Sequence, residues 1–173
     1  MALRFEVSNF SLVLAVAAVS ATLVITVATL GLTDLVLAQG PAKFGFNLTG
    51  SEEVPPVETN ATGMADISAY TIASDSITYS VNATNIEDVT AGHVHFSNPG
   101  ENGPIVFTMF NYDPPRDEVL ETGTITADKL EGPLKGKQVS DLAFAGSNGS
   151  LYMNIHTLEN PNGEIRGTSS IPP

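Results

Sequence analysis

The feature that most restricts the fold is a period-two alternation of apolar and polar residues that recurs along the chain after residue 42. It is clearest in SITYSVNAT (76–84), where Ile77, Tyr79 and Val81 would share one face of a strand. Turns rich in Gly, Pro and Asn separate the alternating stretches, which lie at residues 43–50, 63–72, 76–84, 92–97, 104–110, 119–126, 139–146, 151–157 and 163–169. Residues 127–136 indicate a single helical turn. This spacing predicts an all-β fold, an antiparallel sandwich or barrel of about nine strands.

A long apolar segment precedes this domain. Residues 10–33 carry no charge and are long enough to cross a bilayer as an N-terminal hydrophobic helix. Val36 and Ala38 fit a signal-peptide cleavage site, which favours a signal peptide at residues 1–38, whereas the length of the apolar run favours an uncleaved membrane anchor. Both alternatives predict an exported protein, extracellular or at the cell surface. A short linker at residues 39–43 and a β domain at residues 44–170 would follow.

Composition excludes several classes of function. The formal net charge of −12 repels phosphate backbones, so we expect no nucleic-acid binding. The chain has no cysteine, which excludes disulfides, a thiolate nucleophile and a thiolate zinc site. Hydrolase and phosphate-loop motifs are absent from the sequence, which favours a non-enzymatic role. Four Asn-X-Ser/Thr sequences fit glycosylation of an exported surface: Asn47, Asn60, Asn82 and Asn148.

The three histidines of the chain fall in two blocks, GHVHF and NIHT. On a strand, His93 and His95 would share one face about 7 Å apart. The apolar residues that alternate with them predict that the histidines point away from the core. The expected core comprises Ile77, Tyr79, Val81, Val94, Phe96, Met153 and Ile155. The expected outer face carries His93, His95, Tyr152, Asn154 and His156.

Two interpretations of the histidines remain open. His93, His95 and His156 would suit Cu(II) or Zn(II), because neutral imidazole is a good ligand for both. Asn154 and Glu164 would then form hydrogen bonds to the imidazoles and orient them, without binding the metal themselves. In the other interpretation the histidines fasten the Asn-Pro turns that follow them, through hydrogen bonds to the backbone. Glu164 and Arg166, which share a strand face, would then form only a surface pair or a cross-strand pair.

The acidic stretch EEVPPVET surrounds a Pro-Pro pair that forces extended backbone. Its carboxylates, Glu52, Glu53 and Glu58, have the oxygen ligands that calcium prefers, but their spacing is not that of a calcium-binding loop. We therefore expect a solvated loop at this position.

Three blocks of sequence resemble the CHRD domain, a family first described in chordin and widespread in microbial exported proteins. They are FNLTGSEEVPPVETNATGMA, ITYSVNATNIEDVTAGHVHFSNPGENGPIVF and LYMNIHTLENPNGEIRGTSS, in this order. The resemblance covers nearly all of residues 44–169. The matching motif residues are Glu53, Pro55, Pro56, His93, His95, Asn102, Gly103, Pro104, Asn154, His156, Thr157, Asn160, Pro161, Gly163, Glu164, Arg166 and Gly167.

The resemblance implies an immunoglobulin-like β-sandwich or barrel outside the cell, and it supplies no activity. Two functional hypotheses follow. The first is an exported, non-enzymatic module that binds an extracellular protein or glycan or forms part of the envelope, held to the membrane through residues 10–33 if the leader is not cleaved. The second is a small extracellular metalloprotein with copper or zinc on the three histidines. The HVH spacing is similar to one copper-ligand pair of the copper–zinc superoxide dismutases, whose remaining zinc ligands and disulfide have no counterpart here.

Overall fold

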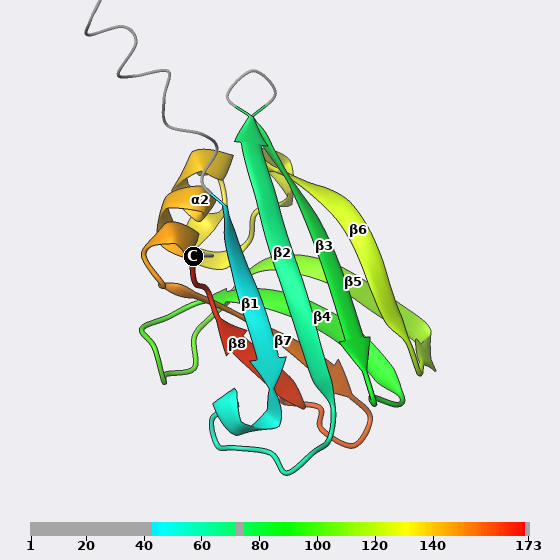
Figure 1. Ribbon diagram of the computed structural model, residues 1–173. Coiled ribbons are helices and arrows are strands. Elements are labelled where there is room, and N and C mark those ends of the chain that lie inside the picture. Colours follow the sequence, from blue (N-terminus) through cyan, green and yellow to red (C-terminus); the bar gives the residue numbers. More distant parts are fainter. Residues whose placement is uncertain (1–42, 72–74, 172–173) are drawn as a thin grey trace, which may run out of the picture. The chain divides into compact units, whose positions relative to one another are not determined.

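The computed structural model of the protein describes residues 43–71 and 75–171, so the predicted leader lies outside the described residues. The described part is an all-β fold with eight antiparallel strands and one α-helix, α2 (Val139–Ser147) (Figure 1). No helix among the described residues meets the length and hydropathy needed to cross a membrane. The strands are β1 (Phe44–Thr49), β2 (Thr62–Thr71), β3 (Ser76–Thr84), β4 (Val89–Phe96), β5 (Ile105–Arg116), β6 (Val119–Thr126), β7 (Leu151–Thr157) and β8 (Ile165–Thr168).

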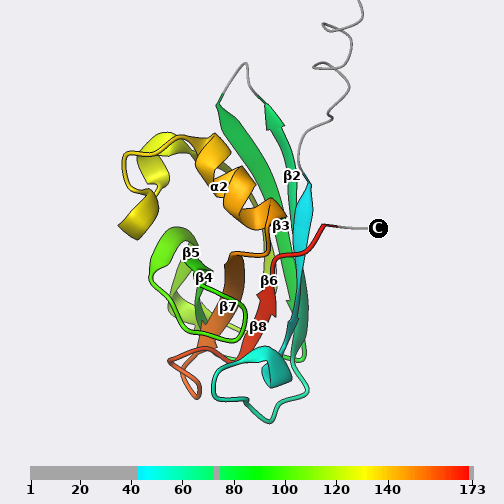
Figure 2. The same ribbon diagram turned by 90° about the vertical axis from the view of Figure 1, so that its left-hand side faces the viewer.

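The eight strands form one sheet in the order β5-β4-β7-β8-β1-β2-β3-β6. This sheet folds over on itself, so that β1 and β2 lie on one side and β4, β5 and β7 on the other (Figure 2). Aromatic packing joins the two sides, because the rings of Tyr79 on β3 and Phe107 on β5 lie 5.8 Å apart. The Tyr79 hydroxyl also donates a hydrogen bond of 2.8 Å to the Met109 carbonyl. The core therefore lies between the two halves of the sheet, which form a nearly closed barrel or sandwich.

The predicted alternation is confirmed on β3, where Ile77, Tyr79, Val81 and Ala83 are buried and the polar residues between them are not. Val94, Met153 and Ile155 are also buried as expected. The prediction is wrong for Phe96, which is 38% exposed. Phe96 is the last residue of β4, so its side chain stands at the end of the strand, and its backbone N–H donates to the Pro104 carbonyl just before β5.

The predicted strand at residues 139–146 is wrong, because these residues form the helix α2. Val139, Leu142, Ala143 and Gly146 are buried, which is the i, i+3, i+4, i+7 spacing of one helical face. Gln138 and Asp141 form a capping box that supplies hydrogen bonds at the N-terminus of the helix. The helical turn expected at residues 127–136 is confirmed as two short 3₁₀ helices, η2 (Ala127–Lys129) and η3 (Gly132–Leu134).

Candidate metal centre

The neighbouring strands β4 and β7 bring the three histidines together. These strands pair antiparallel, with His93 opposite Asn154 and Ala91 opposite His156. His93 Nδ1 lies 2.9 Å from His156 Nε2, and the ring of His95 lies 5.9 Å from that of His93. One nitrogen from each of the three side chains lies within 4.8 Å of the others. Among the described residues this is the group of metal-ligating side chains that converges on one point.

Two loops fix the imidazoles from outside the sheet. His95 Nδ1 lies 2.9 Å from the Gly103 carbonyl in the β4–β5 loop, and His156 Nδ1 lies 3.1 Å from the Pro161 carbonyl in the β7–β8 loop. A carbonyl oxygen only accepts, so His156 Nδ1 donates a proton and Nε2 of its neutral ring holds a lone pair. The neutral ring of His95 has one proton for two acceptor oxygens, the Gly103 carbonyl at Nδ1 and Asn154 Oδ1 at 3.1 Å from Nε2. His156 Nε2 then accepts a hydrogen bond from His93 Nδ1. The β7–β8 loop therefore selects the tautomer that presents Nε2 of His156.

The outer face of β4 and β7 is covered rather than open. His95 is buried and His93 and His156 are half-buried, while Tyr152 and Asn154, also expected on the outside, are each 3% exposed. The alternation along the strands correctly separated these residues from the core. The hydrogen bonds from His95 to Gly103 and from His156 to Pro161 are those expected of histidines that fasten the Asn-Pro turns after them.

Burial keeps the histidines neutral. Burial, followed by the neighbouring His156 and His95, lowers the pKa of His93 to about 4, and Glu131 opposes this shift. Burial also lowers the pKa of His95 and of His156, although their hydrogen bonds to Gly103 and Pro161 oppose this. At neutral pH all three imidazoles are therefore in the uncharged form that binds a metal.

A stack of side chains supports His95. The ring of Tyr152 lies 4.5 Å from that of His95 and nearly parallel to it, and the Arg166 guanidinium lies 3.5 Å from the centre of the Tyr152 ring. Arg166 donates to Asn102 Oδ1 at 2.9 Å and to the Glu101 carbonyl at 2.7 Å, both in the β4–β5 loop. Arg166 is only 1% exposed, so the expectation of a surface pair with Glu164 is wrong. Its role is to hold that loop over the site.

Of the two residues expected to orient the imidazoles, Asn154 contacts a histidine and Glu164 contacts two threonines instead. Asn154 Oδ1 lies 3.1 Å from His95 Nε2, beside the cluster. The Glu164 carboxylate instead accepts hydrogen bonds of 2.8 Å from Thr59 and from Thr157. It therefore fastens the β7–β8 loop to the segment before β2, and the Pro161 carbonyl is the group that holds His156.

Glu53 is a residue that the sequence reasoning misplaced. It follows the short 3₁₀ helix η1 (Gly50–Glu52) and is 5% exposed, so the expected solvated loop is wrong at this position. Burial raises the pKa of its carboxyl, and the positive charge of Arg166 opposes this effect. The rigid Pro-Pro pair that follows Glu53 is the signal in the sequence that this segment has a defined path.

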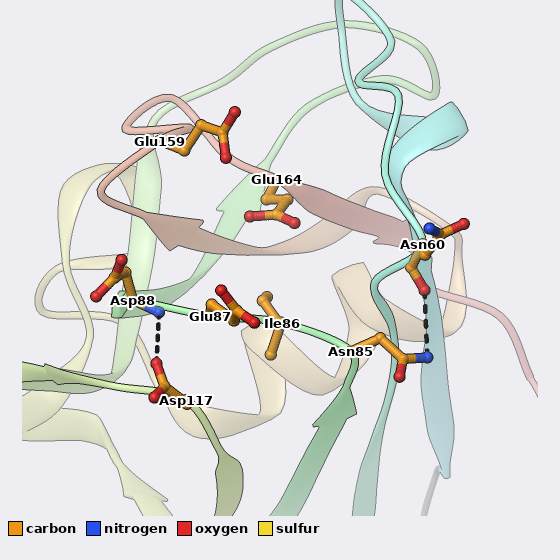
Figure 3. A pocket seen from close by; sticks show the side chains of 8 residues that line it. All are labelled: Asn60, Asn85, Ile86, Glu87, Asp88, Asp117, Glu159 and Glu164. Atoms are coloured by element: carbon orange, nitrogen blue, oxygen red, sulfur yellow. Dashed lines mark hydrogen bonds between the residues drawn. The ribbon is translucent and has the colours of Figure 1, made fainter.

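A pocket is lined by Glu159 and Glu164 of the β7–β8 loop, among other residues, and by none of the three histidines. Its volume is about 590 Å³, and carboxylates line much of its wall (Figure 3). The Asp88 backbone N–H donates to Asp117 Oδ1 at 3.0 Å across this wall. The lining residues are Asn60, Asn85, Ile86, Glu87, Asp88, Asp117, Glu159 and Glu164. None of them is a histidine, so the pocket shares no candidate ligand with the metal centre.

The fold and the cluster define a β-sandwich or barrel with a loop-covered group of three histidines on the outer face of its sheet. The family model of the CHRD domain matches residues 44–168, which is most of the chain. The chain therefore belongs to the CHRD-domain family, as its sequence blocks indicate. A search of curated proteins gave no match.

Proposed function

We propose that this CHRD domain binds one Cu(II) or Zn(II) ion through His93, His95 and His156. The observation that carries the proposal is the convergence of one nitrogen from each histidine within 4.8 Å. The hydrogen bond of His156 Nδ1 to the Pro161 carbonyl adds to it, because it leaves Nε2 of that ring free of a proton.

The spacing suits a first-row metal ion. Two ligands about 2.0–2.1 Å from a tetrahedral ion lie about 3.3 Å apart. The His93–His156 separation of 2.9 Å and the upper limit of 4.8 Å lie on either side of that value. Metal binding would replace the hydrogen bond between His93 Nδ1 and His156 Nε2, and the His93 ring would have to present a nitrogen without a proton. Neutral imidazoles serve both ions, and copper binds more tightly in the divalent series.

The proposed role is binding or storage of the metal by an exported protein. The leader supports export, since residues 10–33 are uncharged and Val36 and Ala38 fit a cleavage site. Mass measurement of the protein from its host tests this part. A polypeptide beginning at Gln39 is expected after cleavage, and a chain retaining residues 1–38 in the membrane fraction after anchoring. A full-length chain in the soluble cell fraction would contradict export.

A second candidate function is favoured by the same hydrogen bonds. His95 and His156 each hold a loop, so the cluster would stabilise a non-enzymatic surface that binds an extracellular protein or glycan, or that forms part of the envelope. In this alternative the imidazoles contribute to folding and bind no ion.

Titration of the untagged full chain with Cu(II), against a competing chelator, separates the two candidates. We expect one ion per chain. Single substitutions His93→Ala, His95→Ala and His156→Ala should each weaken binding tenfold or more and leave the circular dichroism spectrum unchanged. If all three variants bind copper as the parent does but melt well below it, the histidines are loop-fastening residues and the metal proposal fails.

A further inference from the structure

Glu53 is a buried carboxyl near the candidate metal centre that the proposed ligand set does not use. Its Oε1 is buried and, among the described residues, has no hydrogen-bond partner. Burial raises the pKa of Glu53, and this rise is opposed by Arg166, the neighbouring Asn154 amide and the Val54 backbone N–H. A buried acceptor without a hydrogen-bond partner lowers the stability of the fold, so a functional role for Glu53 would explain its presence at this position.

Gly163 brings Glu53 and Asn154 together. A Cβ atom at Gly163 would lie 2.2 Å from Glu53 Oε1 and 2.6 Å from Asn154 Nδ2. The backbone of Gly163 also has a φ of +125°, which L side chains rarely adopt. The absence of a side chain at residue 163 therefore lets the carboxylate and the amide approach the same point.

The Asn154 amide connects this point to His95. Its Nδ2 donates to the Asn162 carbonyl at 3.3 Å, and its Oδ1 lies 3.1 Å from His95 Nε2. An amide presents a donor at one end and an acceptor at the other, so the groups around Nδ2 decide which end faces His95. The Glu53 carboxylate and the Asn162 carbonyl are both acceptors, and both hold Nδ2 away from the imidazole.

We propose that Glu53 is a positioning residue, which sets the orientation of the Asn154 amide and through it that of His95. Its importance for metal affinity rests on the proposed function, but the orientation of His95 does not require an ion. Residues that orient a ligating imidazole typically change metal affinity about 10–100-fold when they are removed. Glu53 thus takes the role that the sequence suggested for Glu164.

The test compares Glu53→Ala and Glu53→Gln in the full chain, with Glu52→Ala as the matched control because Glu52 is exposed. The first readout is the ¹⁵N chemical shifts of the histidine side chains in the metal-free protein. We expect Glu53→Ala to move the His95 resonances, Glu53→Gln to move them less because it keeps an acceptor oxygen, and Glu52→Ala to leave them in place. Cu(II) affinity should fall about tenfold or more in Glu53→Ala and recover in part in Glu53→Gln.

Folded Glu53→Ala and Glu53→Gln proteins whose His95 resonances match those of the parent would overturn the proposal. If Glu53→Ala does not fold, Glu53→Gln decides, since loss of the charge beside Asn154 should still shift His95. A parent that binds no copper would contradict the proposed function alone, because the metal-free resonances still report whether Glu53 positions His95.

Discussion

The pKa of His93 is lowered to about 4, with burial as the main cause and the neighbouring His156 and His95 as further causes. In the unfolded chain the same ring would titrate near 6.5. Between these values the unfolded state binds more protons than the folded state, and this favours unfolding as the pH falls. His95 and His156 act in the same direction, since burial lowers the pKa of both.

The metal-free protein should therefore lose stability as the pH is lowered from about 6.5 towards 4, and the histidine contribution should be fully present above 6.5. A melting temperature lower by on the order of 5 °C at pH 4.5 than at pH 7 is expected. Because other groups also titrate here, the informative comparison is with His93→Gln, whose melting curve should depend less on pH. If the melting temperature depends on pH equally in the parent and in this variant, the fold does not hold His93 in its neutral form.

The strands β4 and β7 show what local sequence determines in this protein. Alternation placed Val94, Met153 and Ile155 in the core and the histidines on the other face, because side-chain direction in a strand depends on the residue's own position. The helix α2 was missed because alternating apolar residues in a short segment also fit a helix, whose capping box of Gln138 and Asp141 was the distinguishing signal.

Val94 tests the register of β4. It is 2% exposed, so Val94→Asp would bury an unpaired charge and should lower the free energy of unfolding by at least about 3 kcal/mol, measured by urea denaturation. Phe96→Asp on the same strand is the control, and its loss should be clearly smaller because Phe96 is 38% exposed. An unchanged midpoint for Val94→Asp, or equal losses for both variants, would contradict the register.

Arg166 tests how the β4–β5 loop is held. Lysine cannot reproduce both the two hydrogen bonds to this loop and the contact with the Tyr152 ring. Arg166→Lys should therefore lower the free energy of unfolding by about 2–4 kcal/mol, and it should weaken Cu(II) binding because Gly103 of the same loop holds His95. Arg116→Lys is the control, since Arg116 has an exposed side chain and a salt bridge of 3.7 Å to Glu121. Comparable losses in both variants would show that the buried contacts of Arg166 have no special role.

The folding of one sheet into two facing halves places the β4–β5 and β7–β8 loops over the histidines. The sequence predicted the all-β class and the three candidate ligands, because both follow from residue type and short-range spacing. The Asn-Pro turns just after each histidine block also indicated the covering loops, but the buried Arg166 and the place of Glu53 could not be predicted in this way. Arg166 meets Asn102 from 64 residues away in the sequence, and Glu53 meets Asn154 beside Gly163. The family match confirms the domain without assigning its ligand.

The central claim is that three imidazoles share one ion. X-ray absorption at the metal edge of the full chain, purified without a histidine tag and loaded with one equivalent of Cu(II) or Zn(II), measures this directly. The account predicts three imidazole nitrogens about 2.0–2.1 Å from the ion, with one fewer in the His156→Ala variant. A metal shell of oxygen ligands without imidazole, unchanged in that variant, would contradict the account.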